Sequence, residues 1–183
     1  MAPCLRKFAL TAHVISSVGW LGAVGVFLAL SVVILTGPDA ETVRAASLAM
    51  ESIGWFVLVP LSIASLVSGL VQSLGTTWGL FRHYWILAKL AINLFATVVL
   101  LLYMQTLGYL AGVAADTTFT RGDLAELRNP SPMLHSSAAL LLLLVATTLS
   151  VYKPRGLTRY GQRKQHEKRA EARSGGLENR GVR

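Results

Sequence analysis

Four stretches of the chain are long enough and apolar enough to cross a lipid bilayer. They cover residues 8–36, 47–74, 84–110 and 133–152. A hydrocarbon core of about 30 Å needs about 20 helical residues, and backbone groups inside it can be satisfied only by helices or closed barrels. The sequence therefore predicts an all-α protein: an up-down-up-down transmembrane bundle over residues 1–152, followed by a tail over 153–183.

The distribution of Lys and Arg predicts the orientation of this bundle. Only 14% of the chain is charged, and thirteen of its 17 Lys and Arg residues fall before the first stretch, between the second and third, or after the fourth, while Lys89 lies near the start of the third. The other three are Arg44, Arg121 and Arg128. Cytoplasmic loops are enriched in Lys and Arg, so both termini are expected in the cytoplasm.

The tail over 153–183 holds ten basic and three acidic residues and few apolar ones. It cannot bury a core, so it is expected to be disordered. Basic residues next to a membrane are attracted to anionic leaflets, which predicts contact with lipid head groups. The tail lacks interleaved aromatic residues, so we expect no binding of nucleic acid.

Local sequence patterns predict where the helices begin and end, and which residues face the bundle interior. Gly37-Pro38-Asp39 is expected to end the first helix, Ser131 to be the N-cap of the fourth, and residues 120–127 to form a short surface helix. Pro60 is expected to free a carbonyl and kink the second helix. A polar stripe on that helix is expected to face the bundle interior; it comprises Glu51, Trp55, Leu58, Ser62, Ser65, Gly69 and Gln72.

The third helix carries a lysine, Lys89, at a depth where a charge is costly unless it pairs, faces water or reaches the interface. One interpretation is that Lys89 extends to lipid phosphates. The other is a ligand site at the cytoplasmic end, in which Arg82 and Lys89 supply charge for an anionic or amphipathic ligand. The site predicted on this reading comprises His13, Gln72, Arg82, His83 and Lys89, with Trp78 and Trp85 as interfacial anchors.

Histidines in a membrane bundle also raise the hypothesis of a b-type haem. His13 and His135 lie near opposite ends of their helices, on the order of 20 Å apart by helical rise, so one iron cannot join them. His13 and His83 are the remaining pair, and they define the alternative redox function. Apart from this haem, no cofactor and no metal are predicted.

Other functions lack their usual residues. The single cysteine, Cys4, cannot form an internal disulfide or a dithiol relay. No phosphate-binding loop, zinc-protease helix or nucleophile elbow is present, and no carboxylate lies mid-membrane. We therefore expect a non-enzymatic membrane protein, either an accessory subunit or a ligand binder. A small channel or carrier is the third hypothesis, and a partner protein or a homo-oligomer is compatible with each.

Three segments resemble one known family. They are HVISSVGWLGAVGVFLAL (residues 13–30), SGLVQSLGTTWGLFRHYWILAKL (68–90) and LSVYKPRGLTRYG (149–161). These are similar to a group of small bacterial integral membrane proteins classed as a domain of unknown function. The resemblance implies a four-helix protein of the bacterial plasma membrane, and it implies no activity.

Overall fold

The computed structural model describes residues 3–75 and 84–152, together with 156, 158, 162, 163 and 167. The described residues contain helices and no strands. Four helical segments are long and apolar enough to cross a membrane: Cys4–Thr36, Ala40–Gly75, Tyr84–Ala115 and Arg121–Tyr152. The predicted helical class and the four candidate spans are confirmed. Most of the predicted tail lies outside the described residues, as do Trp78, Arg82 and His83.

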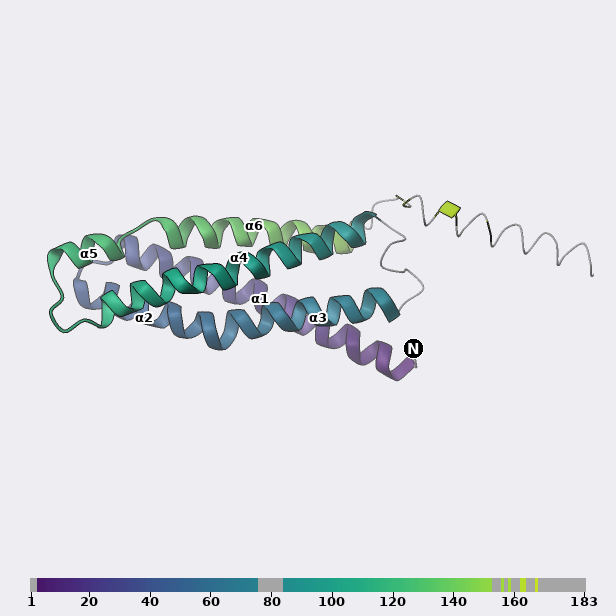
Figure 1. Ribbon diagram of the computed structural model, residues 1–183, viewed down its shortest axis with the longest axis horizontal. Helices are drawn as coiled ribbons and strands as arrows, with labels where there is room; N and C mark the ends of the chain where they lie inside the picture. The colour runs from purple at the N-terminus through teal and green to yellow at the C-terminus, as the bar shows by residue number, and fades with distance from the viewer. Residues whose placement is uncertain are drawn as a thin grey trace, which may run out of the picture.

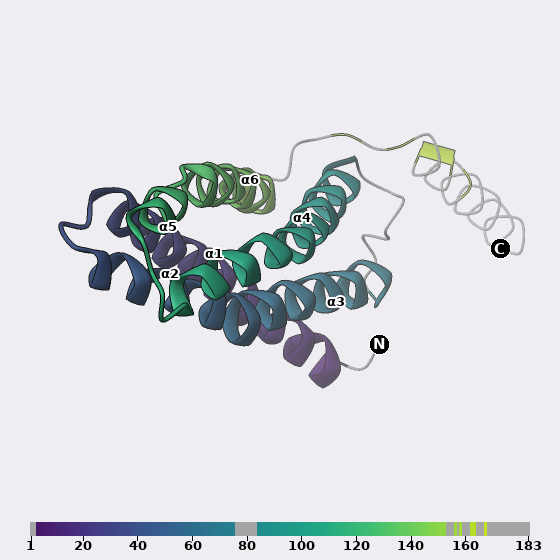
Figure 2. The same ribbon diagram turned by 60° about the vertical axis from the view of Figure 1, so that its left-hand side comes forward.

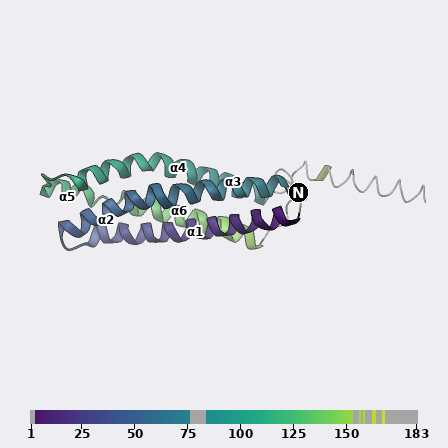
Figure 3. The same ribbon diagram turned by 90° about the horizontal axis from the view of Figure 1, so that it is seen from below.

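The helices form an elongated bundle (Figure 1). Their bounds are α1 Pro3–Thr36, α2 Ala40–Ile53, the π-helical segment η1 Gly54–Leu58, α3 Val59–Gly75, α4 Tyr84–Ala115, α5 Arg121–Leu127 and α6 Ser131–Tyr152. The segment α2–η1–α3 packs against both α1 and α4, and Figure 3 shows it between them. Helix α6 packs on α1 and α4.

The second helical segment begins at Ala40, seven residues before the predicted start at 47. Asp39 is its N-cap: Thr42 donates its backbone N–H to Oδ1 at 2.7 Å and its hydroxyl to Oδ2 at 3.0 Å. These hydrogen bonds hold the pKa of the Asp39 carboxyl below its usual value, so the cap stays ionised at neutral pH. Hydropathy alone did not predict that α2 begins at Ala40, because the first turns of this helix are polar.

The other boundaries are partly as predicted. Helix α4 continues to Ala115 rather than ending at 110. The short surface helix is confirmed as α5, which Thr120 caps by accepting the backbone N–H of Asp123. Ser131 is not the N-cap of α6 but its first residue, and its backbone N–H donates to Asn129 Oδ1 at 2.8 Å. The side chain of Asn129 therefore supplies the hydrogen-bond acceptor that Ser131 was expected to supply.

The second helical segment departs from a regular α-helix just before Pro60, in a π turn over Gly54–Leu58 in which Val59 donates its N–H to Gly54 O. Proline has no N–H to donate, so regular helical bonding cannot continue through it. The wider turn changes which residues face inward. Leu58, Ser62 and Ser65 are buried as predicted, but Trp55 is 49% exposed. The predicted interior stripe is therefore wrong at Trp55.

Two arginines bind helix ends at the Asp39 end of the bundle. Arg44 donates from Nε to Ala114 O at 2.6 Å and from Nη2 to Asp116 O at 2.9 Å, at the end of α4. Arg128 donates from Nη2 to Gly37 O at 2.7 Å, just beyond α1. Carbonyls at helix C-termini lack intrahelical donors and carry partial negative charge, so both contacts are favourable.

Packing is much tighter toward the Asp39 end than toward the opposite end, which carries Arg6 and is called here the Arg6 end. Among the described residues, no α4 residue before Ala96 and no α3 residue after Ser65 is fully buried. The core cluster in α1 runs from Trp20 to Ile34. Helices α3 and α4 also diverge toward the Arg6 end (Figures 1 and 2). Half-buried polar side chains occupy this less tightly packed part of the bundle.

Candidate functional site

His13 is held by α3 at the Arg6 end. Its Nδ1 lies 3.1 Å from Ser65 O and 3.1 Å from Ser68 Oγ. A carbonyl oxygen only accepts, so Nδ1 carries a proton, and in the neutral imidazole Nε2 is then an acceptor. No described residue makes a hydrogen bond to Nε2. Gly69 allows this approach, because a Cβ there would lie 3.1 Å from His13 Cε1.

Ser65 joins three helices through one hydroxyl. It is 1% exposed, and its Oγ lies 2.8 Å from Ser17 Oγ of α1. Asn93 of α4 donates from Nδ2 to the same oxygen at 3.1 Å. Helical spacing places Ser65, Ser68 and Gln72 on one side of α3 toward α1. We call His13, Ser17, Ser65, Ser68 and Asn93 the polar cluster.

Gln72 forms a second link between α1 and α3. Its Nε2 donates to Ala9 O at 2.9 Å. Ala9 is buried beneath this contact. Gln72 Nε2 is therefore bonded to the protein backbone, one turn closer to the Arg6 end than the polar cluster.

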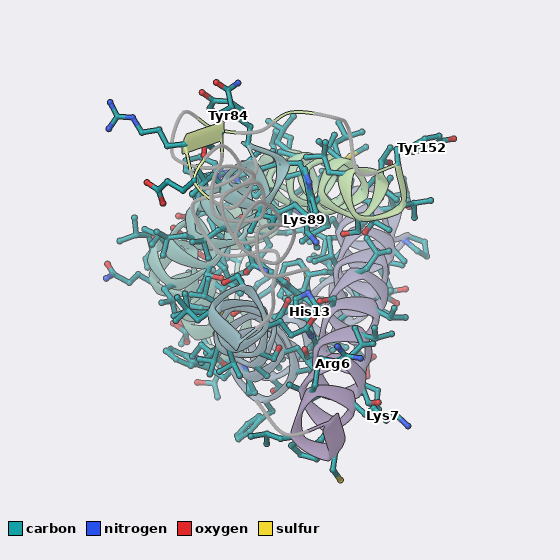
Figure 4. All side chains as sticks on the ribbon, turned by 90° about the vertical axis from the view of Figure 1, so that its right-hand side faces the viewer. Arg6, Lys7, His13, Tyr84, Lys89 and Tyr152 are labelled. Carbon is teal, nitrogen blue, oxygen red and sulfur yellow. The ribbon has the colours of Figure 1, made fainter. Side chains whose placement is uncertain are left out.

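Lys89 of α4 is half-buried near the polar cluster. Its Nζ lies 5.5 Å from the centroid of the Trp85 ring, within the range of a cation–π interaction. Lys89 also acts electrostatically on His13. Figure 4, which looks onto the Arg6 end, shows both side chains directed into the interior of the bundle. A cation and an imidazole therefore share this region.

One buried acceptor in the polar cluster has no hydrogen-bond partner among the described residues. Asn93 donates through Nδ2, but its Oδ1 is buried without a hydrogen bond. An unsatisfied buried oxygen is costly, and more so at membrane depth. The polar cluster thus presents two acceptors, Asn93 Oδ1 and His13 Nε2, beside the positive charge of Lys89.

The structure brings together three of the five predicted site residues: His13, Gln72 and Lys89. Arg82 and His83 lie outside the described residues, as does the predicted anchor Trp78. Sequence analysis did not assign Ser17, Ser65, Ser68 or Asn93 to the site. Ser65 was on the predicted interior stripe, but its link to Asn93 depends on how α3 and α4 pack.

Metal and haem ligation depend on the histidines. His13 uses Nδ1 in hydrogen bonds, which leaves Nε2 as its ligating atom. His135 stacks on Tyr103 with ring centroids 4.1 Å apart, and its Nδ1 donates to Ser131 O at 2.9 Å, in another part of the bundle. Within residues 3–75, 84–152 and the few described beyond them, no three His, Cys, Asp or Glu side chains cluster as a metal site.

No protein-family model, curated protein or solved structure matches the chain. The resemblance to small bacterial membrane proteins therefore stays a prediction.

Proposed function

We propose that the chain is an up-down-up-down bundle of the bacterial plasma membrane with both termini in the cytoplasm. Four apolar helical segments support insertion. Arg6, Lys7, Tyr84 and Tyr152 lie toward one end of the bundle (Figure 4). That end carries Arg6 and Lys7 and leads into the basic tail, so the preference of Lys and Arg for the cytoplasmic side makes it the cytoplasmic end.

We further propose that the protein is a non-enzymatic binder of an anionic, amphipathic ligand at this end, either by itself or as an accessory subunit. The observation that carries the proposal is the position of Lys89 beside the polar cluster, where the core is least tightly packed. A half-buried cation in a membrane helix is a functional candidate because its burial is costly.

Each residue has a role in this proposal. Lys89 and Arg82 supply positive charge to the ligand's anionic group. Asn93 Oδ1 and His13 Nε2 accept hydrogen bonds from hydroxyl groups beside it, and Gln72 keeps α1 and α3 together below the site. Trp78 and Trp85 hold the helix ends at the interface, where indole rings prefer to lie. An anionic phospholipid with a hydroxylated head group combines the required charge, hydroxyl groups and apolar chains.

Native mass spectrometry of the purified protein tests this binding. We expect wild type to retain phosphatidylglycerol in preference to phosphatidylcholine. Replacing both Arg82 and Lys89 with alanine should weaken phosphatidylglycerol binding about tenfold or more, because charge-assisted contacts contribute about 1.5–3 kcal/mol each. Arg121→Ala, in α5, is the matched control and should bind as wild type does. The basic tail is unchanged in all three proteins, so equal binding by the double variant would reject the site.

Haem b is the second candidate, favoured by the unbonded Nε2 of His13, with His83 as the other ligand. A visible absorption spectrum distinguishes it, because a haem protein shows a Soret band and reduced α and β bands. A colourless preparation from haem-replete cells would end this hypothesis. The third candidate, a small channel or carrier, predicts solute flux into liposomes that contain the purified protein.

A further inference from the structure

Helix α4 carries a continuous exposed stripe along most of its length. Its members are spaced alternately by four and three residues, and each is exposed: Ala91, Phe95, Val98, Leu102, Gln105, Tyr109 and Gly112. We call this set the α4 stripe. A seven-residue repeat of this kind is the pattern of a helix that supercoils left-handedly with another helix.

Gln105 is the member of the α4 stripe whose side-chain amide cannot form hydrogen bonds with lipid chains. Tyr109 donates its hydroxyl to Glu126 Oε1 at 2.7 Å, whereas Gln105 makes no hydrogen bond to any described side chain. Every hydrocarbon window of about 20 residues in α4 that begins after Trp85 contains Gln105. The amide therefore lies at a depth where only another protein group can pair with it.

We propose that the α4 stripe is the contact surface for a second copy of this chain. Two copies inserted with the same topology hold their α4 helices parallel about a twofold axis along the membrane normal. Gln105 of one copy then lies at the same depth as Gln105 of the other. A primary amide has both donors and acceptor lone pairs, so it is complementary to an identical amide.

Gly112 fits this contact as well. A Cβ at Gly112 would meet nothing within 4 Å in the single chain, so its surface is open to a neighbouring helix. Small residues let membrane helices approach closely, and side-chain amides supply interhelical hydrogen bonds. A single polar residue in an otherwise apolar seam also fixes the register and the number of helices that associate.

Energy transfer between donor- and acceptor-labelled full-length protein in lipid vesicles tests the proposal. Wild type should dimerise as the protein-to-lipid ratio rises. Gln105→Leu should raise the dissociation constant about 3- to 30-fold, the effect of losing interhelical hydrogen bonds of this kind. Gln105→Asn should restore most of the affinity. Thr106→Val, an exposed neighbour outside the stripe, is the control and should dimerise normally.

Cysteine cross-linking tests the geometry, because a residue on a parallel twofold axis meets its own copy. In a Cys4→Ser background, Leu102→Cys should form an intermolecular disulfide on oxidation, whereas Val67→Cys, exposed on α3, should not. A chain that stays monomeric at every lipid ratio overturns the proposal. So does a dimer whose dissociation constant is unchanged in Gln105→Leu, or one that cross-links through Val67→Cys and not through Leu102→Cys.

Discussion

Replacing Ser65 with alanine is expected to lower the free energy of unfolding by about 1–3 kcal/mol. The substitution removes the hydroxyl that pairs with Ser17 and accepts from Asn93, so two side chains on two other helices lose their partner at once. Interhelical hydrogen bonds in membranes are individually modest, but a buried amide left without a partner adds its desolvation cost. Unfolding in lipid bicelles measures the loss.

Ser62→Ala is the matched control for Ser65→Ala. Both serines are fully buried in α3, but Ser62 donates only to Val59 O of its own helix, at 2.8 Å. Its loss leaves no side chain without a partner, so we expect a clearly smaller change. Equal destabilisation by the two substitutions would mean that Ser65 does not connect α1, α3 and α4 energetically. Weakened lipid binding in Ser65→Ala would further link the polar cluster to the proposed site.

Replacing Gly54 with valine is expected to destabilise the bundle by about 1–3 kcal/mol, the usual cost of overpacking a core. A Cβ at Gly54 would lie 2.8 Å from both Sδ and Cε of Met104, which is itself buried. Sδ and Cε are the flexible end of the Met104 side chain, but Met104 is buried, so it has little space into which it can move away from the π turn that Gly54 begins. Thermal unfolding in detergent would detect the change.

Two further variants separate overpacking from the loss of glycine itself. Gly22 in α1 has nothing within 4 Å of its Cβ position, so Gly22→Val should have little effect on stability. Met104→Ala opens space beside residue 54, so adding it to Gly54→Val should cost less than the sum of the two single changes. Strict additivity would show that Gly54 and Met104 do not interact.

The number and type of the helices were predictable because hydrophobic length alone requires them. Hydropathy did not mark the start of α2, since its first turns lie beyond the apolar stretch and depend on the Asp39 cap. Nor did it mark the π turn. Pro60 predicted a kink, but the sequence did not predict the π turn over Gly54–Leu58 that precedes it.

The candidate site could likewise be predicted only in part, because its hydrogen bonds join residues that are far apart in sequence. His13, Gln72 and Lys89 were recognisable as polar residues in apolar helices, where each needs a partner. Their partners could not be identified, because a helical repeat gives the face on which a residue lies but not the helix opposite it. Ser65 and Asn93 meet only when α3 and α4 pack together. The unpaired Asn93 Oδ1 likewise emerges only from the packed structure.

Labelling of Cys4 with a membrane-impermeant maleimide tests the proposed topology most directly. Cys4 is the single cysteine and is exposed near the start of α1, at the Arg6 end of the bundle. In intact bacterial spheroplasts we expect no labelling until the membrane is permeabilised, both for wild type and for a Cys4→Ser/Gly181→Cys variant that reports the other terminus. Labelling of either cysteine in intact spheroplasts would contradict the four-span arrangement with both ends, and therefore Lys89 and His13, toward the cytoplasm.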